Sequence, residues 1–313
     1  MNNVSENNNS QPTSLPAGVN RRGPLDAGGE KIKIAIQKSG RLSEKSLELL
    51  SECGIKISNG DRKLKTEARN FPMEILFLRD DDIPQYVEQG VADIGILGEN
   101  EVWEKEKDVA EIEKLGFGNC RLSLAIPKDE VYTNLDYFNG KRIATSYPKI
   151  LKKYFGLKGI DVKIEELGGS VEIATGIGLA DGIFDIVSTG STLIMNGLKE
   201  VEAIIKSEAV LISNKNLSEA KQQLLEKLLF RIRAYKRGIG SKYIVMNAPN
   251  KSIPTICSIL PGMKSPSILP LAEEGWSSIH SVVQEDQFWD VIDALKDVEA
   301  QGILVMNIEK MIV

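Results

Sequence analysis

The sequence predicts an α/β protein with two lobes, each built on a parallel sheet, and a ferredoxin-like unit at the carboxyl end. Continuous apolar strands alternate with helices along most of the 313 residues, which is typical of parallel sheets covered on both faces. After Gly238 the order becomes strand, helix, strand, strand, helix, strand. The chain is expected to cross twice between the two lobes, so a cleft should lie where the loops after their strands meet.

The first lobe is expected to hold residues 31–126. Its first stretch, "KIKIAIQKSGR" (31–41), predicts a strand and a polar turn, and "LSEKSLELLSECG" (42–54) predicts a helix that ends at a glycine. Strands followed by loops are predicted in "MEILFLRDDDIP" (73–84) and "VADIGILGEN" (91–100). The three consecutive aspartates favour helix capping over a metal site, because consecutive side chains point in different directions.

The second lobe is expected at 127–200, and the chain should return to the first lobe through 201–225. The stretch "GKRIATSYPKILKKYFGLKG" (140–159) predicts a strand, a short turn and a helix. Residues 226–313 are expected to hold the rest of a long amphipathic helix, as a linker, and the ferredoxin-like unit. Residues 1–30 are polar and rich in Gly and Pro, without the apolar segment of a signal peptide, and predict a disordered tail.

Composition narrows the function classes. The net charge is −5, so no basic surface for nucleic acid is expected. No apolar run of about 18 residues exists, so no membrane span is expected. Cys53, Cys120 and Cys257 are widely separated, which suits neither disulfides nor a metal motif and favours a cytoplasmic protein. The single histidine, His280, lies in the alternating pattern "GWSSIHSVV" and is expected to be an ordinary strand residue.

The stretch "FDIVSTGSTL" (184–193) carries the strongest chemical signal. It ends an apolar strand with one aspartate, Asp185, and continues into a loop of hydroxyl side chains around a glycine. Loop N–H groups and hydroxyls of this kind bind phosphate, and the aspartate could accept hydrogen bonds from ribose hydroxyls. An ordinary strand end followed by a helix cap explains the residues equally well. The loop residues are Ser188, Thr189, Gly190, Ser191 and Thr192.

Three further charges are candidates at the same cleft. Lys38 and Arg41 follow the first strand, where a lysine and an arginine fork could bind phosphate oxygens. Glu172, beside a Gly-Gly turn, could orient hydroxyls or a metal-bound water. Taken singly, the two cations are better explained as solvated charges, and the glutamate as a carboxylate paired with a helix dipole.

Together these stretches resemble one family, ATP phosphoribosyltransferase in its long form. The resemblance covers nearly everything from Lys31 to Val313, and its most specific part runs from Glu172 to Leu193. It implies a two-lobed fold like that of type II periplasmic binding proteins, with a C-terminal regulatory domain of ACT-like form. The stretches that carry it are "IAIQKSGRLS", "LRDDDIP", "GVADIGILGEN", "FGNCRLSLAIP", "GKRIATSYP", "GSVEIA", "GLADGIFDIVSTGSTL", "LPGMKSPSILPLAEEGW" and "GILVMNIEKMI".

The resemblance implies the transfer of a phosphoribosyl group from phosphoribosyl pyrophosphate to N1 of ATP, with Mg²⁺. Because N1 carries no proton, no general base is required. By position, the loop 188–192 would hold the 5-phosphate and Asp185 the ribose hydroxyls. Arg41 and Lys38 would lie on the phosphate and nucleotide side, and Glu172 would contact the ribose or a magnesium-bound water.

The resemblance also implies feedback inhibition by histidine, bound between C-terminal domains, and a homo-hexamer in equilibrium with a dimer. The residues expected at the inhibitor site are Asn247, Met263, Ser267 and Gly302. Some relatives carry an aspartate at the position of Asn247, and a neutral side chain there weakens a charged contact with the inhibitor's amino group.

Other assignments predict different features. Purine and pyrimidine phosphoribosyltransferases have two acids before a similar loop, whereas Phe184 occupies the first of those positions here. A non-catalytic small-molecule sensor with the same two-lobed fold would lack the phosphate loop. Prephenate dehydratase, which also joins a two-lobed core to an ACT domain, would carry a Thr-rich catalytic motif that this sequence does not contain.

Overall fold

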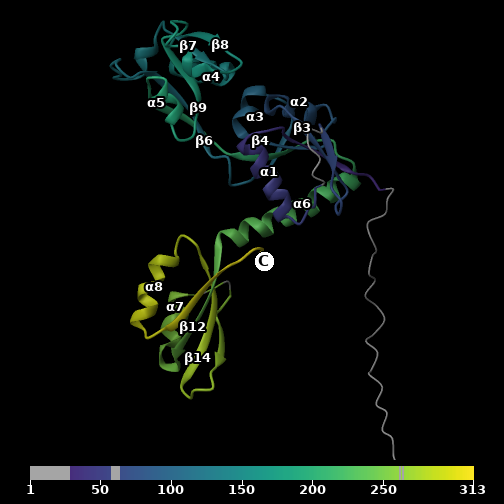
Figure 1. Cartoon of the computed structure of the whole chain (residues 1–313), viewed down its shortest axis with the longest axis vertical. Helices are drawn as coiled ribbons and strands as arrows, with labels where there is room; N and C mark the ends of the chain where they lie inside the picture. The colour runs from purple at the N-terminus through teal and green to yellow at the C-terminus, as the bar shows by residue number, and fades with distance from the viewer. Residues whose placement is uncertain (1–28, 58–63, 261, 263) are drawn as a thin grey trace, which may run out of the picture.

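The computed structural model describes residues 29–57, 64–260, 262 and 264–313. Its strands form three sheets: two belong to neighbouring α/β lobes, and the third lies beyond the far end of helix α6 (Glu219–Ile239) (Figure 1). Most of the expected tail and Met263 lie outside the described residues.

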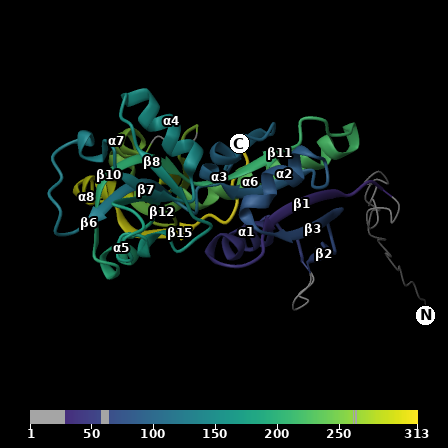
Figure 2. The ribbon, with the colours of Figure 1, turned by 90° about the horizontal axis from the view of Figure 1, so that it is seen from above.

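The first sheet has the strand order β2-β3-β1-β4-β11-β5. Its central strand β1 pairs in parallel with β3 and β4, whereas β11 is antiparallel to β4 and β5. Ile34 and Ile36 of β1 pack on one face with residues of α1 and α6, and Ala35 packs on the other with Ile83 and Val102. Figure 2 shows β1, β3 and β2 next to one another at this end of the molecule. The elements are β1 Ile32–Gln37, α1 Arg41–Glu52, β2 Lys65–Glu67, β3 Met73–Leu78, η1 Asp80–Asp82, α2 Ile83–Glu88, β4 Ile94–Gly98, α3 Glu99–Lys105, β5 Ala110–Lys114 and β11 Ala209–Ser213.

The second sheet has the order β10-β6-β9-β7-β8. Here β7 pairs in parallel with β8 and β9, and β6 is antiparallel to β9 and β10. Phe184 and Phe155 pack on the face that α4 covers, and Ile183 and Leu193 pack on the face covered by α5. The elements are β6 Cys120–Pro127, η2 Leu135–Phe138, β7 Arg142–Thr145, α4 Pro148–Lys158, β8 Lys163–Glu166, η3 Val171–Ile173, β9 Gly182–Val187, α5 Ser191–Met195 and β10 Leu198–Ser207.

The two lobes share one strand order. In the first sheet the parallel strands lie in the order β3-β1-β4, and the antiparallel strand β11 separates them from β5. In the second sheet the parallel strands lie in the order β8-β7-β9, and the antiparallel strand β6 separates them from β10. The antiparallel strands, β6 and β11, are those that the chain enters on crossing from the other lobe. Two such lobes joined by two crossings form the fold of type II periplasmic binding proteins, as the resemblance implied.

The lobe boundaries differ from those expected from the sequence. The boundaries expected from the sequence place most of β6 and residues 201–207 of β10 in the first lobe. In the structure β6 pairs with both β10 and β9, so the second sheet spans residues 120–207. Helix α6 also continues through residue 225, and its Leu228 and Ile232 are buried in the core of the first lobe. An apolar strand or helix face has the same pattern whichever neighbour it packs against, so periodicity alone did not place these boundaries.

The third sheet has the order β13-β14-β12-β15 and is antiparallel throughout, which is the ferredoxin-like arrangement predicted from the sequence. Ile256 of α7 and Leu295 of α8 pack with Ile244 and Ile279 on one face of this sheet. The elements are β12 Ser241–Pro249, η4 Asn250–Ser252, α7 Ile253–Ile259, β13 Ser267–Pro270, β14 Trp276–Gln284, α8 Phe288–Asp297 and β15 Gln301–Asn307.

Candidate active site

Polar contacts join the two lobes at the ends of their strands. The Tyr147 hydroxyl, in the turn after β7, donates to Oε1 of Glu101 at 2.8 Å, and Nδ2 of Asn100 donates to the tyrosine oxygen at 3.1 Å. One helical turn later, the Glu104 carboxylate accepts the amides of Lys149 and Ile150 at the start of α4, each at 3.0 Å. Helix α3, which begins directly after β4, therefore lies against the turn between β7 and α4.

These interlobe contacts have a marked electrostatic effect. Burial raises the pKa of Glu101 to about 7, although the hydrogen bond from Tyr147 lowers it. Burial, with the nearby Glu101 charge, raises the pKa of Tyr147 well above its ordinary value, so the phenol keeps its proton and donates it. Neither residue is among the predicted site residues, and the only signal for them in the sequence is a polar side chain soon after a buried strand.

The hydroxyl-rich loop leaves β9 and enters α5. Gly190 has a φ of 80°, in the left-handed region that favours glycine. Ser188, Thr189, Ser191 and Thr192 are exposed, and the Thr189 and Ser191 hydroxyls lie 3.0 Å apart. Within the described ranges, the amides of residues 189–192 donate to no acceptor. The loop therefore presents a row of open N–H and O–H donors, which is a suitable receptor for an anion.

Asp185 lies two residues before the end of β9, opposite Ser123 of β6. Its Oδ1 accepts the amide of Ile186 at 2.8 Å. Burial is the main cause that raises the pKa of Asp185, to about 6; the Ile186 amide opposes this rise and the negative charge of Glu172 adds to it. Phe184 points to the opposite face and is fully buried in the core of the second lobe. The structure thus brings Asp185 and Glu172 within electrostatic reach and leaves one acid on this face of β9.

Lys38 and Arg41 lie at the end of β1 and at the first residue of α1, on either side of Gly40, whose φ is 91°. Both side chains are exposed, and neither makes a hydrogen bond or ion pair with any residue in the described parts of the chain. They are cations open to solvent, and among the described residues no hydrogen bond or ion pair joins their side chains to the hydroxyl-rich loop of the other lobe.

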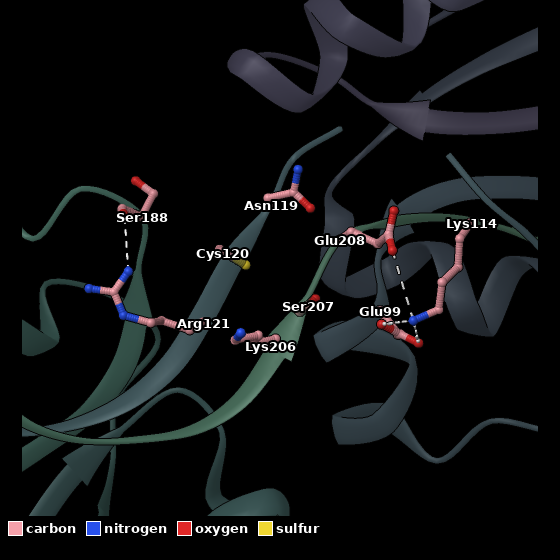
Figure 3. Close-up of a pocket in the computed structure, with 9 residues that line it drawn as sticks. All are labelled: Glu99, Lys114, Asn119, Cys120, Arg121, Ser188, Lys206, Ser207 and Glu208. Carbon is pink, nitrogen blue, oxygen red and sulfur yellow. Dashed lines mark hydrogen bonds and ion pairs between the residues drawn. The ribbon is translucent and has the colours of Figure 1, made fainter. Parts of the chain in front are cut away.

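A cavity of about 420 Å³ lies where the chain crosses between the lobes. Figure 3 shows Ser188 and Arg121 at one end of it and the Lys114–Glu99 ion pair, 3.0 Å long, at the other. Of the residues predicted to form the site, Ser188 alone lines this cavity. Arg121 was not foreseen, because an arginine at the start of a strand has no distinctive local pattern. The lining residues are Glu99, Lys114, Asn119, Cys120, Arg121, Ser188, Lys206, Ser207 and Glu208.

The residues expected to bind an inhibitor lie at two separate places in the third sheet. Asn247 of β12 lies beside Gly302 of β15: a Cβ on that glycine would be 3.9 Å from Nδ2 of the asparagine. Ser267 lies on the edge strand β13, opposite His280, and β14 separates it from β12. His280 is a strand residue, as predicted, and its Nδ1 lies 2.8 Å from the Tyr243 hydroxyl.

The described residues contain neither a ready-made metal centre nor a membrane-spanning helix. No group of three or more His, Cys, Asp or Glu side chains there is arranged to hold a metal ion. None of the helices in those ranges is both long and apolar enough to cross a membrane.

Comparison with known proteins gives consistent matches. The family model described as ATP phosphoribosyltransferase matches residues 79–234, and the model of the HisG C-terminal domain matches residues 239–310. The ATP phosphoribosyltransferase of Bacteroides thetaiotaomicron is 57% identical over 282 residues, which is 90% of this chain and 100% of that protein. That of Cytophaga hutchinsonii is 54% identical over 281 residues, 90% of this chain and 98% of that protein.

A solved structure agrees with the relatives. A chain of the ATP phosphoribosyl transferase (HisG:HisZ) complex from Thermotoga maritima is 33% identical, with a TM-score of 0.55, over 64% of this chain and 98% of that one. Identity of this extent over nearly the whole chain, with family models matching both its core and its C-terminal unit, shows that the chain belongs to the ATP phosphoribosyltransferase family.

Proposed function

We propose that the protein transfers the 5-phosphoribosyl group of phosphoribosyl pyrophosphate to N1 of ATP, the first step of histidine biosynthesis. The bond from the anomeric carbon to pyrophosphate breaks, and a bond from that carbon to N1 forms. The observation that carries the proposal is that relatives 57% identical over 90% of the chain bear this enzyme's name. The open donors of the loop 188–192 support it, because the ribosyl donor carries a phosphate that such a loop can bind.

The second lobe would bind the ribosyl donor. Amides and hydroxyls of Ser188, Thr189, Gly190, Ser191 and Thr192 would surround the 5-phosphate. Asp185, with a pKa of about 6, is mostly ionised at neutral pH and would accept hydrogen bonds from the two ribose hydroxyls. Binding the donor at both ends would orient its anomeric carbon for attack, which is a large part of catalysis in a reaction between two bound substrates.

The first lobe would bind the remaining negative charges, those of the nucleotide phosphates or the departing pyrophosphate. Lys38 and Arg41 are exposed cations without partners in the described chain, so they are free to pair with the nucleotide phosphates or the departing pyrophosphate. The N1 lone pair of adenine attacks directly, so the chemistry asks for charge stabilisation and orientation rather than for a base.

Magnesium would be held mainly by the substrates. Mg²⁺ keeps several waters and binds through one or two carboxylates together with substrate phosphates. Glu172 is close enough for its charge to raise the pKa of Asp185, and a pair of neighbouring carboxylates fits this mode of binding. The ion would neutralise the charge that develops on the leaving pyrophosphate. Glu172 would then contact a magnesium-bound water or the ribose.

Histidine would inhibit through the third domain. Asn247 and Gly302 are neighbours, but Ser267 lies two strands away in the same sheet. A site that uses all of them together with Met263 would therefore need C-terminal domains from different subunits. This favours the assembly expected from the resemblance, a homo-hexamer in equilibrium with a dimer. The widely spaced free cysteines support a cytoplasmic location.

One assay tests the proposal. The purified full chain is mixed with ATP, phosphoribosyl pyrophosphate, Mg²⁺ and pyrophosphatase, and the absorbance of phosphoribosyl-ATP is followed. A folded sample without signal would refute the enzymatic function and favour a sensor of the same fold. Added histidine should lower the rate and bind by calorimetry; unchanged rates without binding would remove the regulatory assignment alone.

A further inference from the structure

Arg121 connects three neighbouring segments of the second lobe. It lies near the start of β6, between β9 and β10. Its Nε and Nη2 donate to the two carboxylate oxygens of Glu200 on β10, each at 2.5 Å, and its Nη1 donates to the carbonyl of Ser188 at 3.1 Å. The planar guanidinium thus holds a carboxylate with two bonds on one side and the first residue of the hydroxyl-rich loop on the other.

The partner carboxylate is itself fixed. The Ser123 hydroxyl donates to Oε1 of Glu200 at 2.8 Å, and Ser123 is buried in the sheet. Arg121 holds the pKa of Glu200 below its usual range, so the pair stays ionised at neutral pH. The β6–β10 register also shifts between Glu200 and Glu202, an irregularity of the kind that redirects a strand side chain.

The other anchors of the loop lie mainly at its far end. There the Gly190 carbonyl accepts the amide of Ile194 in α5, and the Thr192 carbonyl accepts the backbone amide and the side-chain Nδ2 of Asn196. At its near end, among the described residues, the Arg121 guanidinium is the side chain that hydrogen-bonds the loop backbone. A Ser-Thr-Gly segment has many accessible conformations, and a loop fixed at both ends loses less entropy when it binds an anion.

We propose that Arg121, held by Glu200, is a positioning residue for the ribosyl donor: it fixes the backbone of Ser188 so that the loop amides converge on the donor's phosphate. The proposal rests on the function proposed above for this loop. It differs from a direct contact between Arg121 and a substrate anion in the cavity, and the two roles predict opposite effects of removing the Glu200 charge.

The test uses two variants of the full chain and a matched control. Arg121→Gln removes the loop anchor, and Glu200→Gln releases the guanidinium. Arg142→Gln is the control: Arg142 of β7 also bonds a carboxylate, Asp181 Oδ1 at 3.1 Å, and a loop carbonyl, that of Gly178 at 3.1 Å, but not in the hydroxyl-rich loop. Steady-state kinetics give KM for the ribosyl donor and for ATP, and calorimetry gives donor affinity without turnover.

We expect both Arg121→Gln and Glu200→Gln to raise the donor KM about tenfold and to leave the ATP KM within about twofold, as for a lost interaction with one substrate. Arg142→Gln should change neither KM. If Glu200→Gln instead strengthens donor binding, as the loss of a negative charge near an anion site would, Arg121 contacts the anion directly and positioning is wrong.

Equal changes in both KM values, or the same donor effect from Arg142→Gln, would also overturn the inference, since each indicates general loosening of the lobe. If Arg121→Gln does not fold, the affinity of Glu200→Gln for the ribosyl donor, measured by calorimetry, decides between positioning and direct contact. An inactive wild-type protein refutes the proposed function, whereas an active wild type with unchanged variants refutes only the role of Arg121.

Discussion

Replacing Asp185 by Asn should make the protein more stable and a poorer enzyme. Burial and the Glu172 charge raise the pKa of Asp185 from 3.8 to about 6. The charged form of Asp185 therefore destabilises the folded protein. This destabilisation is absent below the pKa that Asp185 has in the unfolded chain, and it is complete above the pKa that it has in the folded protein. A change of this size corresponds to about 3 kcal/mol, an upper limit because the side chain is partly exposed to water. An asparagine oxygen can still accept the Ile186 amide.

The same substitution removes the carboxylate proposed to receive the ribose hydroxyls. Losing a hydrogen bond to a charged group costs about 1.5–3 kcal/mol, which is roughly a ten- to hundredfold rise in donor KM. Urea denaturation above pH 7 and near pH 4, with kinetics for both substrates, measures the two effects. Stability should rise at the higher pH and change little at the lower one.

Asp181→Asn is the matched control. It lies just before the same strand, but Arg142 holds the pKa of Asp181 below its usual range, so its loss should lower stability at neutral pH. The reasoning fails if Asp185→Asn destabilises the protein at neutral pH, or if ATP KM rises while donor KM does not.

Four further substitutions test other parts of the fold, the last of them as a control for the third. Burial raises the pKa of Glu101 from 4.5 to about 7, so ionisation of this carboxyl is less favourable in the folded protein. The free energy of unfolding should therefore fall as the pH rises from 4.5 to about 7, and Glu101→Gln should flatten the profile of urea midpoint against pH. Glu104→Ala, which removes the acceptor of two α4 amides, should lower stability by about 1–2 kcal/mol in urea denaturation, whereas an unchanged midpoint would show that the contact is dispensable. Gly238→Ala would place a Cβ 2.7 Å from backbone atoms of Glu309 and should lower the melting temperature by displacing the C-terminal segment from α6, at a cost of about 1–3 kcal/mol. Gly156 lies in helix α4, where an added Cβ would have no neighbouring atom within 4 Å, so Gly156→Ala should instead raise stability by about 1 kcal/mol. Equal losses of stability in both variants would contradict the steric explanation.

Much of the architecture could be predicted from local patterns. Continuous apolar strands and glycine stops identified the α/β lobes, and the change of pattern after Gly238 identified the ferredoxin-like sheet. The loop 188–192 and Asp185 could be chosen because their chemistry is contiguous in the sequence. Their roles remain predictions, as do those of Lys38, Arg41 and Glu172.

Other features depend on contacts between distant segments. The placement of β6 and β10 in the second sheet depends on their pairing with each other, which a strand pattern cannot encode. Arg121 reaches Glu200 across 79 positions and Ser188 across 67, and Tyr147 reaches Glu101 across 46. None of these pairings can be identified from the residues next to either partner in the sequence.

The sequence alone therefore determined the class of fold, the resemblance to a family and the loop most suited to a phosphate, because each depends on residues close together in the chain. The tertiary structure decided where the lobes divide and which charges are buried. It also decided that Phe184 turns into the core while Asp185 lies on the opposite face of β9 with Glu172 in electrostatic reach. Burial and pairing are properties of segments brought together by folding, and they set the pKa of Asp185 and the anchoring of its loop.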